Sequence, residues 1–493
     1  MSGWWGPEML LLAALLAPLA AAVLIPFLGS VPNLREAVTL LAAALLAVFV
    51  WSLLPHVLAG ERPEWTLTQA LPGIAIAFRV EPLGMLFALV AGSLWFVNSV
   101  YSIGYMRANN EPRQTSYYAF FAIAIAATIA LAFAKNLLTL FIFYEALTLS
   151  TFPLVTHKRS PEAISGGRIY LSLLIGTSMV LLLPAIVWTG FLAGTLDFAA
   201  GGILAGKAGD GMLAVLLALY VFGIGKAALM PFHFWLPAAM VAPTPVSALL
   251  HAVAVVKAGV FAVLKVIVYV FGIGTLAESG AGEWLAWAAG FTVIAASLVA
   301  LRQTNLKKRL AYSTVSQLSY VVLAAAILMP ISAVGAAMHI AAHAVAKITL
   351  FFAAGSIYTA SHKTEIGELD GIGWRMPWTM GAFGIGALAM IGVPPTAGFL
   401  GKWFMLQGGV ATANWLAVAV IVVSTILNAS YFLPIVWRAF LAEPADGDGK
   451  GGHKHGEAPF AVVAPLVFTA AMTLVLFFWP DVPFALAQLM LKG

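Results

Sequence analysis

Two things are nearly missing from this chain of 493 residues: cysteine and charge. It contains no cysteine, which excludes disulfides, haem attached through thiols and iron–sulfur clusters ligated by this chain. Asp, Glu, Lys and Arg together make up 9% of the residues, whereas soluble domains carry about 25%. So few charges cannot form a water-soluble surface at this length. The sequence therefore predicts an all-α polytopic membrane protein.

Long apolar runs take the place of charged residues, and 62% of the chain is hydrophobic. Because one membrane-spanning helix needs roughly 20 apolar residues, we expect about fourteen transmembrane helices. No basic residue precedes the first run, so we expect a retained helix there and not a cleaved signal peptide. The expected ranges are 9–28, 36–55, 82–105, 117–133, 136–156, 169–193, 212–230, 247–273, 284–301, 310–329, 331–358, 377–410, 414–437 and 459–479.

The basic residues between these helices indicate the topology. Loops on one side carry fifteen Lys or Arg residues, including the stretch RQTNLKKR at residues 302–309, and the other side carries five. Cytoplasmic loops are enriched in these residues, so we expect both termini on the outer, periplasmic face of the cell inner membrane. The net charge of +5 then reflects topology, and no nucleic-acid partner is expected. We interpret His453 and His455 as part of a flexible cytoplasmic loop, not a metal site.

A few charged residues fall inside the apolar runs. Burying a lysine in hydrocarbon costs about 2.5–3.5 kcal/mol on insertion scales, so such residues usually serve a function. A lysine near a helix end can instead reach the interface, which is the alternative for Lys265. Glu145 is the one acidic residue that we place in the membrane interior. The basic residues placed there are Lys226, Lys257, Lys265, Lys347, Lys402, His233, His251, His339 and His343.

Proline interrupts two of the predicted helices. The interrupted segments read GIGKAALMPFHFWLPAAMVAPTPVSALL and IGVPPTAGFLGKW, and each contains an interior lysine, Lys226 or Lys402. Proline removes a helical hydrogen bond, and non-helical backbone at membrane depth is tolerated only inside protein or beside a water-filled cavity. Paired broken helices are a sequence sign of a transport site.

The two breaks fall in the seventh and the twelfth predicted helix. An offset of five helices turns the second copy upside down relative to the first, which predicts two inverted five-helix repeats at residues 117–273 and 284–440. Residues 1–116 then supply three N-terminal helices. Residues 441–493 supply the polar cytoplasmic loop and the fourteenth helix.

His339, His343 and Lys347 are spaced i, i+4, i+8, so they line one face of one helix. Two histidines at this spacing can bind a metal, but no acid or thiol completes a site and the lysine would repel a cation. Haem ligation and neutral packed histidines are further alternatives. A proton relay explains all three residues together, because histidine titrates near neutrality and a desolvated lysine releases its proton readily.

Glu145 has only amines as interior neighbours, and an ion pair with Lys226 would lower the cost of burying it. Together the interior groups predict a line of proton carriers through both repeats, with no metal and no cofactor. The predicted carriers are Glu145, Lys226, His251, Lys257, His339, His343, Lys347 and Lys402.

The stretch GKAALMPFHFWLPAAMVAPTPVSALLHAVAVVKAGVF resembles the signature of the antiporter-like subunit family. That family includes the A and D subunits of Mrp-type Na⁺/H⁺ antiporters, the three large proton-pumping membrane subunits of respiratory complex I, and subunits of membrane-bound hydrogenases. The resemblance covers about 117–440 and implies fourteen helices with two inverted repeats. By position, Glu145 matches the glutamate of the fifth helix, Lys226 the lysine of the seventh, His251 and Lys257 polar positions of the eighth, His339, His343 and Lys347 the relay of the eleventh, and Lys402 the lysine of the twelfth that faces the exit channel.

The resemblance favours the D subunit of an Mrp-type antiporter, because some complex I members carry glutamate at the place of Lys402 and neither a lateral C-terminal helix nor an extra domain is expected. It implies a proton-translocating subunit of a multisubunit monovalent cation (Na⁺/K⁺)/H⁺ antiporter. The alternatives are a pump subunit of a complex I-like NADH-quinone oxidoreductase, a hydrogenase or an inorganic-carbon-uptake complex. A redox subunit that itself binds haem or quinone is a different class, which the absorbance of the purified chain would reveal. We expect as partners other membrane subunits, the bilayer, protons and monovalent cations.

Overall fold

Proline marks the start of many long helices. In the computed structural model, which describes residues 6–443 and 456–492, a proline begins α1, α2, α3, α6, α15 and α16. Proline suits this position because its missing N–H would have no partner in the first turn. In the first half of the chain the helices are α1 (Pro7–Leu24), α2 (Pro32–Leu58), α3 (Pro82–Ala108), α4 (Gln114–Ala132), α5 (Leu137–Val155), α6 (Pro161–Thr177), α7 (Leu183–Ala193), α8 (Asp210–Gly223), α9 (Trp235–Ala238), α10 (Thr244–Ala248), α11 (Val255–Val266) and α12 (Ile273–Ser279).

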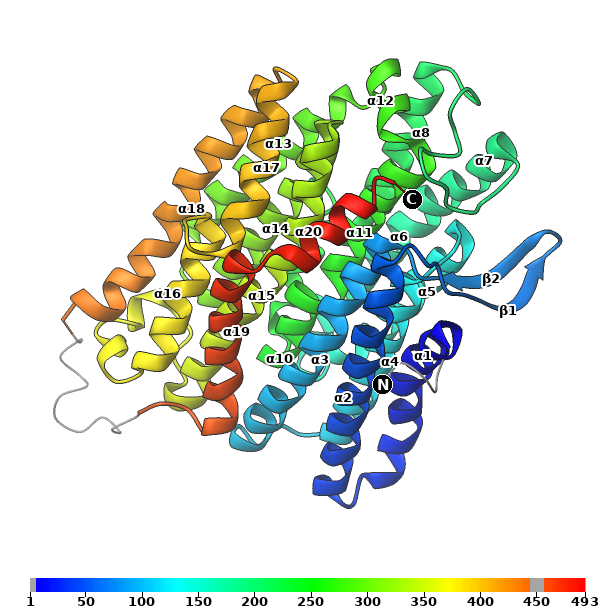
Figure 1. Ribbon diagram of the computed structural model, residues 1–493. Coiled ribbons are helices and arrows are strands. Elements are labelled where there is room, and N and C mark those ends of the chain that lie inside the picture. The colour runs from blue at the N-terminus through cyan, green and yellow to red at the C-terminus, as the bar shows by residue number, and fades with distance from the viewer. Residues whose placement is uncertain (1–5, 444–455, 493) are drawn as a thin grey trace.

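The second half continues the bundle (Figure 1). Its helices are α13 (Glu283–Arg302), α14 (Leu306–Ala326), α15 (Pro330–Ser361), α16 (Pro377–Ile391), α17 (Ala397–Ala411), α18 (Trp415–Leu441), α19 (Phe460–Phe478) and α20 (Asp481–Leu489). Each of the fourteen expected ranges overlaps a helix. Within the described residues, eleven helices are long and apolar enough to cross a membrane, and α8 and α16 are shorter apolar helices. The all-α multi-pass fold is confirmed, whereas the number fourteen stays a prediction.

Both interruptions lie where the prolines predict them. After α8, the chain runs through short turns, including the 3₁₀ turn η3 (Gly225–Ala227), and regular helix resumes at Thr244. The second break separates α16 from α17 and begins at Gly392, whose φ of +87° suits glycine. A Cβ on Gly392 would lie 2.8 Å from Cδ of Lys402, so this glycine also makes room for the lysine.

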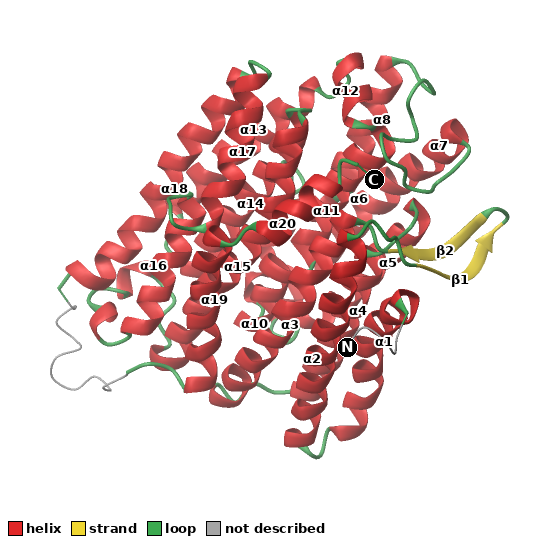
Figure 2. Cartoon of the chain, viewed as in Figure 1, coloured by secondary structure: helices red, strands yellow, loops and turns green. Residues whose placement is uncertain are grey.

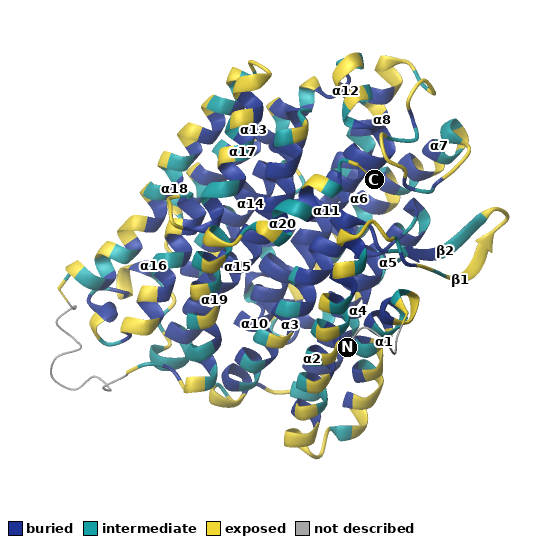
Figure 3. Cartoon of the chain, viewed as in Figure 1, coloured by how far each residue is buried: buried dark blue, intermediate teal, exposed yellow. Residues whose placement is uncertain are grey.

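Two membrane-length segments form the centre of the molecule. One is Thr244–Phe271, in which π-helical turns η5 (Leu249–Val253) and η6 (Ile267–Phe271) flank α11, and the other is α15. Every residue in their most apolar 18-residue window is buried, against 33% for α1, and both segments are enclosed by other helices (Figure 3). Charged side chains on these two segments therefore face protein and not lipid.

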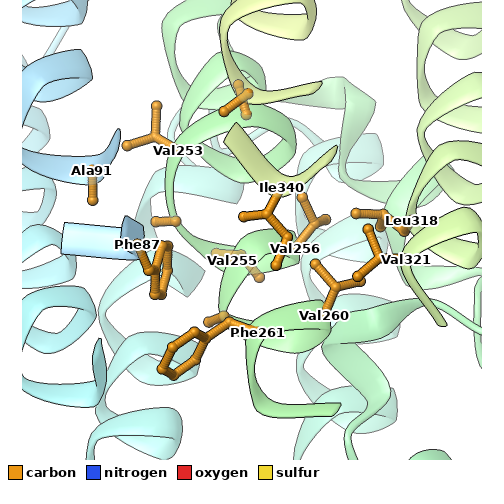
Figure 4. Packing of buried hydrophobic residues seen from close by; sticks show 14 of the residues in the cluster. Phe87, Ala91, Val253, Val255, Val256, Val260, Phe261, Leu318, Val321 and Ile340 are labelled. Carbon is orange, nitrogen blue, oxygen red and sulfur yellow. The ribbon is translucent and has the colours of Figure 1, made fainter. Parts of the chain in front are cut away.

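Apolar side chains fill the space around these central segments. Val256 and Val260 of α11 lie near Ile340 of α15 in the packed interior (Figure 4). On another side, the rings of Phe261 and Phe87 stack at 5.0 Å between α11 and α3. This packing excludes solvent, so any polar group in the centre must find its partners within the protein.

Two described elements were not predicted from the sequence. An antiparallel hairpin of β1 (Glu64–Leu71) and β2 (Ile74–Arg79) projects from the side of the bundle (Figure 2), and the short helix α20 follows α19. The segment that contains His453 and His455 lies outside the described residues. The division into two inverted repeats also stays a prediction.

Candidate proton-relay site

The predicted carriers are buried. The side chains of Lys226, His251, Lys257, His339, His343 and Lys347 are at most 1% exposed, Lys402 is 4% exposed and Glu145 is 8% exposed. They come from α5, η3, η5, α11, α15 and α17, so the fold brings together residues that lie far apart in the sequence. Their contacts divide them into three groups: one at each break and one between.

The first group lies where η3 meets α5. Asn136 caps the start of α5 by accepting a hydrogen bond of 2.9 Å from the backbone N–H of Thr139. Two turns further on, the Nζ of Lys226 donates to Thr148 Oγ1 at 2.5 Å and to the carbonyl oxygen of Tyr144 at 2.9 Å. The ammonium also lies 3.2 Å from the ring centroid of Tyr144, a close cation–π contact.

The ion pair expected between Glu145 and Lys226 is not formed in this structure. Lys226 bonds instead to a hydroxyl and a carbonyl of α5, and neither carboxylate oxygen of Glu145 has a hydrogen-bond partner among the described residues. Glu145 still attracts Lys226 electrostatically. The acid is therefore near the lysine, yet its oxygens are free to accept a proton.

The second group links α11 to α15. The Nζ of Lys257 and the Nδ1 of His343 are 2.5 Å apart, and the ring centroids of His343 and His339 are 6.0 Å apart. His339 places its Nε2 3.0 Å from the Oε1 of Gln317 on α14. The predicted i, i+4 face thus joins a lysine to two successive imidazoles.

Two more carriers contact α14. The Nζ of Lys347 donates to Ser313 Oγ at 2.6 Å and to the carbonyl oxygen of Leu310 at 3.3 Å. His251 places its Nδ1 3.1 Å from Thr314 Oγ1. Lys347 and His251 thus reach neighbouring hydroxyls of one helix. The Nε2 of His251, the Nδ1 of His339 and the Nε2 of His343 have no hydrogen-bond partner among the described residues.

The third group lies at the second break. The Nζ of Lys402 donates to the carbonyl oxygens of Met390 at 3.1 Å and Ile391 at 2.9 Å, and it lies 4.7 Å from the ring centroid of Tyr320. It connects to the second group through close packing of α17 on α15. A Cβ on Gly401 would lie 3.0 Å from Cβ of His339, so only glycine allows this approach.

Lys265 does not reach an interface. Its side chain is 0% exposed, and its Nζ lies 3.0 Å from Glu81 Oε2 and 2.8 Å from the carbonyl oxygen of Ala134. The interpretation of Lys265 as an interface lysine is wrong, because a buried carboxylate far away in sequence holds it. His233 stands apart from the three groups and faces the carbonyl oxygen of Pro231 at 3.3 Å.

Sequence reasoning missed the neutral partners of the carriers. Thr148 is one turn after Glu145, and Thr314 and Gln317 lie on one face of α14, so helical spacing was an available signal for these three. Tyr144 and Tyr320 carried no such signal. Within the described ranges, no group of three or more His, Asp or Glu side chains could hold a metal ion.

Comparison with known proteins identifies the relatives of this arrangement. The profile of a family described as NADH:quinone oxidoreductase/Mrp antiporter, transmembrane, matches residues 134–428. NADH-quinone oxidoreductase subunit N of Desulforudis audaxviator is 32% identical over 441 residues, which cover 88% of this chain and 86% of that protein. The A/B subunit of a probable K⁺/H⁺ antiporter of Rhizobium meliloti is 30% identical over 93% of this chain but only 46% of its own length.

The fold is also shared with a solved structure. A chain in the structure of the Mrp complex from Dietzia sp. superposes with a TM-score of 0.86 over 99% of this chain and 97% of that chain, at 22% identity. The likeness therefore extends over nearly the whole of both chains, including both breaks and the helices between them.

Proposed function

Because this chain belongs to the NADH:quinone oxidoreductase/Mrp antiporter family of membrane proteins, we propose that it is a proton-translocating subunit of a multisubunit monovalent cation (Na⁺/K⁺)/H⁺ antiporter. In this proposal the chain works beside other membrane subunits and moves protons without chemistry of its own. It lies in the cell inner membrane with both termini on the outer face, and residues 117–273 and 284–440 act as the two inverted halves.

One observation carries the proposal: the titratable side chains form a buried series that retains free proton-accepting atoms. Buried polar atoms are nearly always hydrogen-bonded, so unpaired ones call for a reason. Here they include both carboxylate oxygens of Glu145 and one ring nitrogen each of His251, His339 and His343. A group that must take up and release protons needs such an atom.

The geometry supports a direction for each step. Glu145 and Lys226 form the carrier pair at the first break, and Lys257 passes the proton to His343 across 2.5 Å. His343 and His339 continue along α15, with Lys347 and His251 modulating the charge of this section. Lys402 then delivers the proton at the second break. Lysine suits each place because burial and nearby charges change its proton affinity.

A second candidate function is a proton-pumping membrane subunit of a complex I-like NADH-quinone oxidoreductase. The 32% identity to a subunit N, over 86% of that protein, favours it. The two candidates differ in the partners that drive transport. Purifying the native complex and recording its absorbance separates them, because flavin and iron–sulfur bands accompany a redox pump only.

Replacing the pair at the first break tests the shared relay. Glu145→Gln and Lys226→Ala each remove the titratable group while changing the side-chain volume little or only downward. We expect ΔpH-driven exchange in everted vesicles to fall at least about tenfold in either variant, which corresponds to ~1.4 kcal/mol in the barrier. Glu278→Gln and Lys207→Ala, both at exposed positions, are matched controls that keep wild-type rates. Near-normal exchange in Glu145→Gln or Lys226→Ala, at equal amounts of inserted protein, would refute the relay.

A further inference from the structure

A second polar region lies away from the relay, at the ends of several helices. A cavity of about 180 Å³ opens between the end of α3, the return of the first break at 240–244, the start of α14 and the end of α15. Its lining includes three lysines, Lys158, Lys307 and Lys363. This is the side on which the sequence places most basic loop residues.

The cavity carries a strong positive charge. None of its lining residues is acidic. Glu111 is the nearest acid that acts on Lys158 and Lys307, yet no carboxylate of the described residues lies within ion-pair distance of either lysine. Burial raises the pKa of Glu111, against the pull of Lys158 and Lys307, so it compensates their charge poorly.

The lysines are held on a rigid frame. The backbone N–H of Leu306 donates to the carbonyl oxygen of Thr364 at 2.9 Å, and Asn305 donates from its side chain to Glu365 at 2.9 Å. These bonds fix the segment of Lys363 to the start of α14. The Nζ of Lys307 donates to the carbonyl oxygen of Ala242 at 2.6 Å, which ties α14 to the return of the first break.

We propose that this cavity binds a phosphate-bearing anion through Lys158, Lys307 and Lys363. Clustered ammonium groups repel one another and repel Na⁺ or K⁺, so the cavity cannot admit the coupling cation. A phosphate group instead accepts charge-assisted hydrogen bonds from lysine, and its negative charge relieves the repulsion among the three. Free ammonium protons remain at Lys307 after its one bond to Ala242, since each ammonium has three.

The position of the cavity gives the bound anion a structural consequence. Lys158 follows α5 in the first predicted repeat, whereas Lys307 and Lys363 belong to the second. An anion held by all three would join the two halves next to the first break. It could be soluble phosphate or the headgroup of an anionic lipid, because both present the same oxygens to the lysines.

Thermal stability of the purified full chain distinguishes the two sources. In the first arm, inorganic phosphate is titrated at constant ionic strength in detergent, and the unfolding midpoint is recorded. In the second arm, the chain is placed in nanodiscs of phosphatidylcholine with or without phosphatidylglycerol, and retained phosphatidylglycerol is measured after delipidation. A ligand that binds only the folded state raises the midpoint in a saturable manner.

Lys158→Gln is the test variant, because this lysine is exposed and its replacement leaves the packing intact. Lys308→Gln is the matched control, since it removes an equal charge from the neighbour of a cavity lysine without touching the lining. We expect the dissociation constant for phosphate to rise about tenfold or more in Lys158→Gln, the loss of one hydrogen bond to a charged group, and to stay unchanged in Lys308→Gln.

Each outcome decides the proposal. Saturable stabilisation by inorganic phosphate that Lys158→Gln loses supports a soluble anion. Retention of phosphatidylglycerol that Lys158→Gln loses, with no effect of inorganic phosphate, supports a lipid headgroup. Absence of both effects in the wild-type chain, or equal effects in Lys158→Gln and Lys308→Gln, overturns the site.

Discussion

The two broken helices hold their lysines in similar surroundings but balance the charge differently. Lys226 lies 3.2 Å from the ring of Tyr144 on α5, and Lys402 lies 4.7 Å from the ring of Tyr320 on α14. The fifth and tenth predicted helices, which contain these tyrosines, are equivalent in the two predicted repeats. A lysine over a tyrosine ring is therefore common to both breaks.

What differs is the source of negative charge. Lys226 has the carboxylate of Glu145 nearby, whereas Lys402 bonds to the carbonyl oxygens of Met390 and Ile391 at the C-terminal end of α16. The last carbonyls of a helix have no intrahelical partner and carry about half a negative charge in total. A carboxylate can gain a proton or turn away, but a helix end cannot. The first break can therefore switch its charge, and the second offers a fixed one.

The largest effect should come from changing how Lys402 carries its proton. Lys402→Arg keeps the positive charge but stays protonated, so we expect exchange to fall at least about tenfold. Lys402→Glu should keep measurable exchange, because a protonated carboxyl can still donate to the carbonyl oxygen of Met390. Measuring both variants side by side in everted vesicles decides the matter. If arginine is tolerated better than glutamate, Lys402 merely anchors a helix end.

Much of this comparison could be predicted from sequence because charge in an apolar run is costly and therefore conspicuous. Prolines at the two breaks and the isolated Glu145 stand out in this way. The breaks and the buried carriers were predicted on that basis, and so was the adjacency of His339 and His343 on one helix face.

The partners of the carriers were harder to predict, because hydroxyls and rings are ordinary in helices. Whether Tyr144 or Glu145 meets Lys226 depends on the rotation of α5 about its axis, which sequence spacing alone does not determine. The partner of Lys265, Glu81, is even less accessible because the two are far apart in the chain. The hairpin at 64–79 did leave a signal, a Pro72-Gly73 turn between alternating residues, that our helix-based interpretation passed over.

An intermediate effect is expected from the tyrosine rings. Cation–π contacts of desolvated cations contribute about 2 kcal/mol, so removing a ring alters the charged state of the lysine beneath it. We expect Tyr144→Leu to slow exchange several-fold and Tyr320→Leu to slow it less, since the second ring is farther from its lysine. The measurement is the initial exchange rate per inserted molecule.

Phenylalanine variants are the matched controls, because they keep the ring and lose only the hydroxyl. Tyr144→Phe gives up a 3.1 Å hydrogen bond from the backbone N–H of Lys226, and Tyr320→Phe loses its bond to Ser424. Both should exchange faster than the corresponding leucine variants. Equal rates for leucine and phenylalanine at position 144 would mean that the ring contributes nothing to transport.

The smallest effect on transport should follow from Lys265, which adds a third kind of buried lysine to the comparison. Its carboxylate partner is permanent: Glu81 lies 3.0 Å away and is held from the other side by two hydrogen bonds from Arg79. A fully paired lysine of this kind has no reason to release its proton. Glu81→Gln or Lys265→Met should therefore leave exchange per inserted molecule near the wild-type rate. Each should nevertheless lower stability by about 3–5 kcal/mol, because it leaves one charge buried without its partner. The double variant Glu81→Gln/Lys265→Met removes both charges and should recover much of that loss, as measured by thermal unfolding in detergent. Loss of exchange in Lys265→Met as severe as in Lys226→Ala would place Lys265 in the relay and remove the distinction between switchable and permanent pairs.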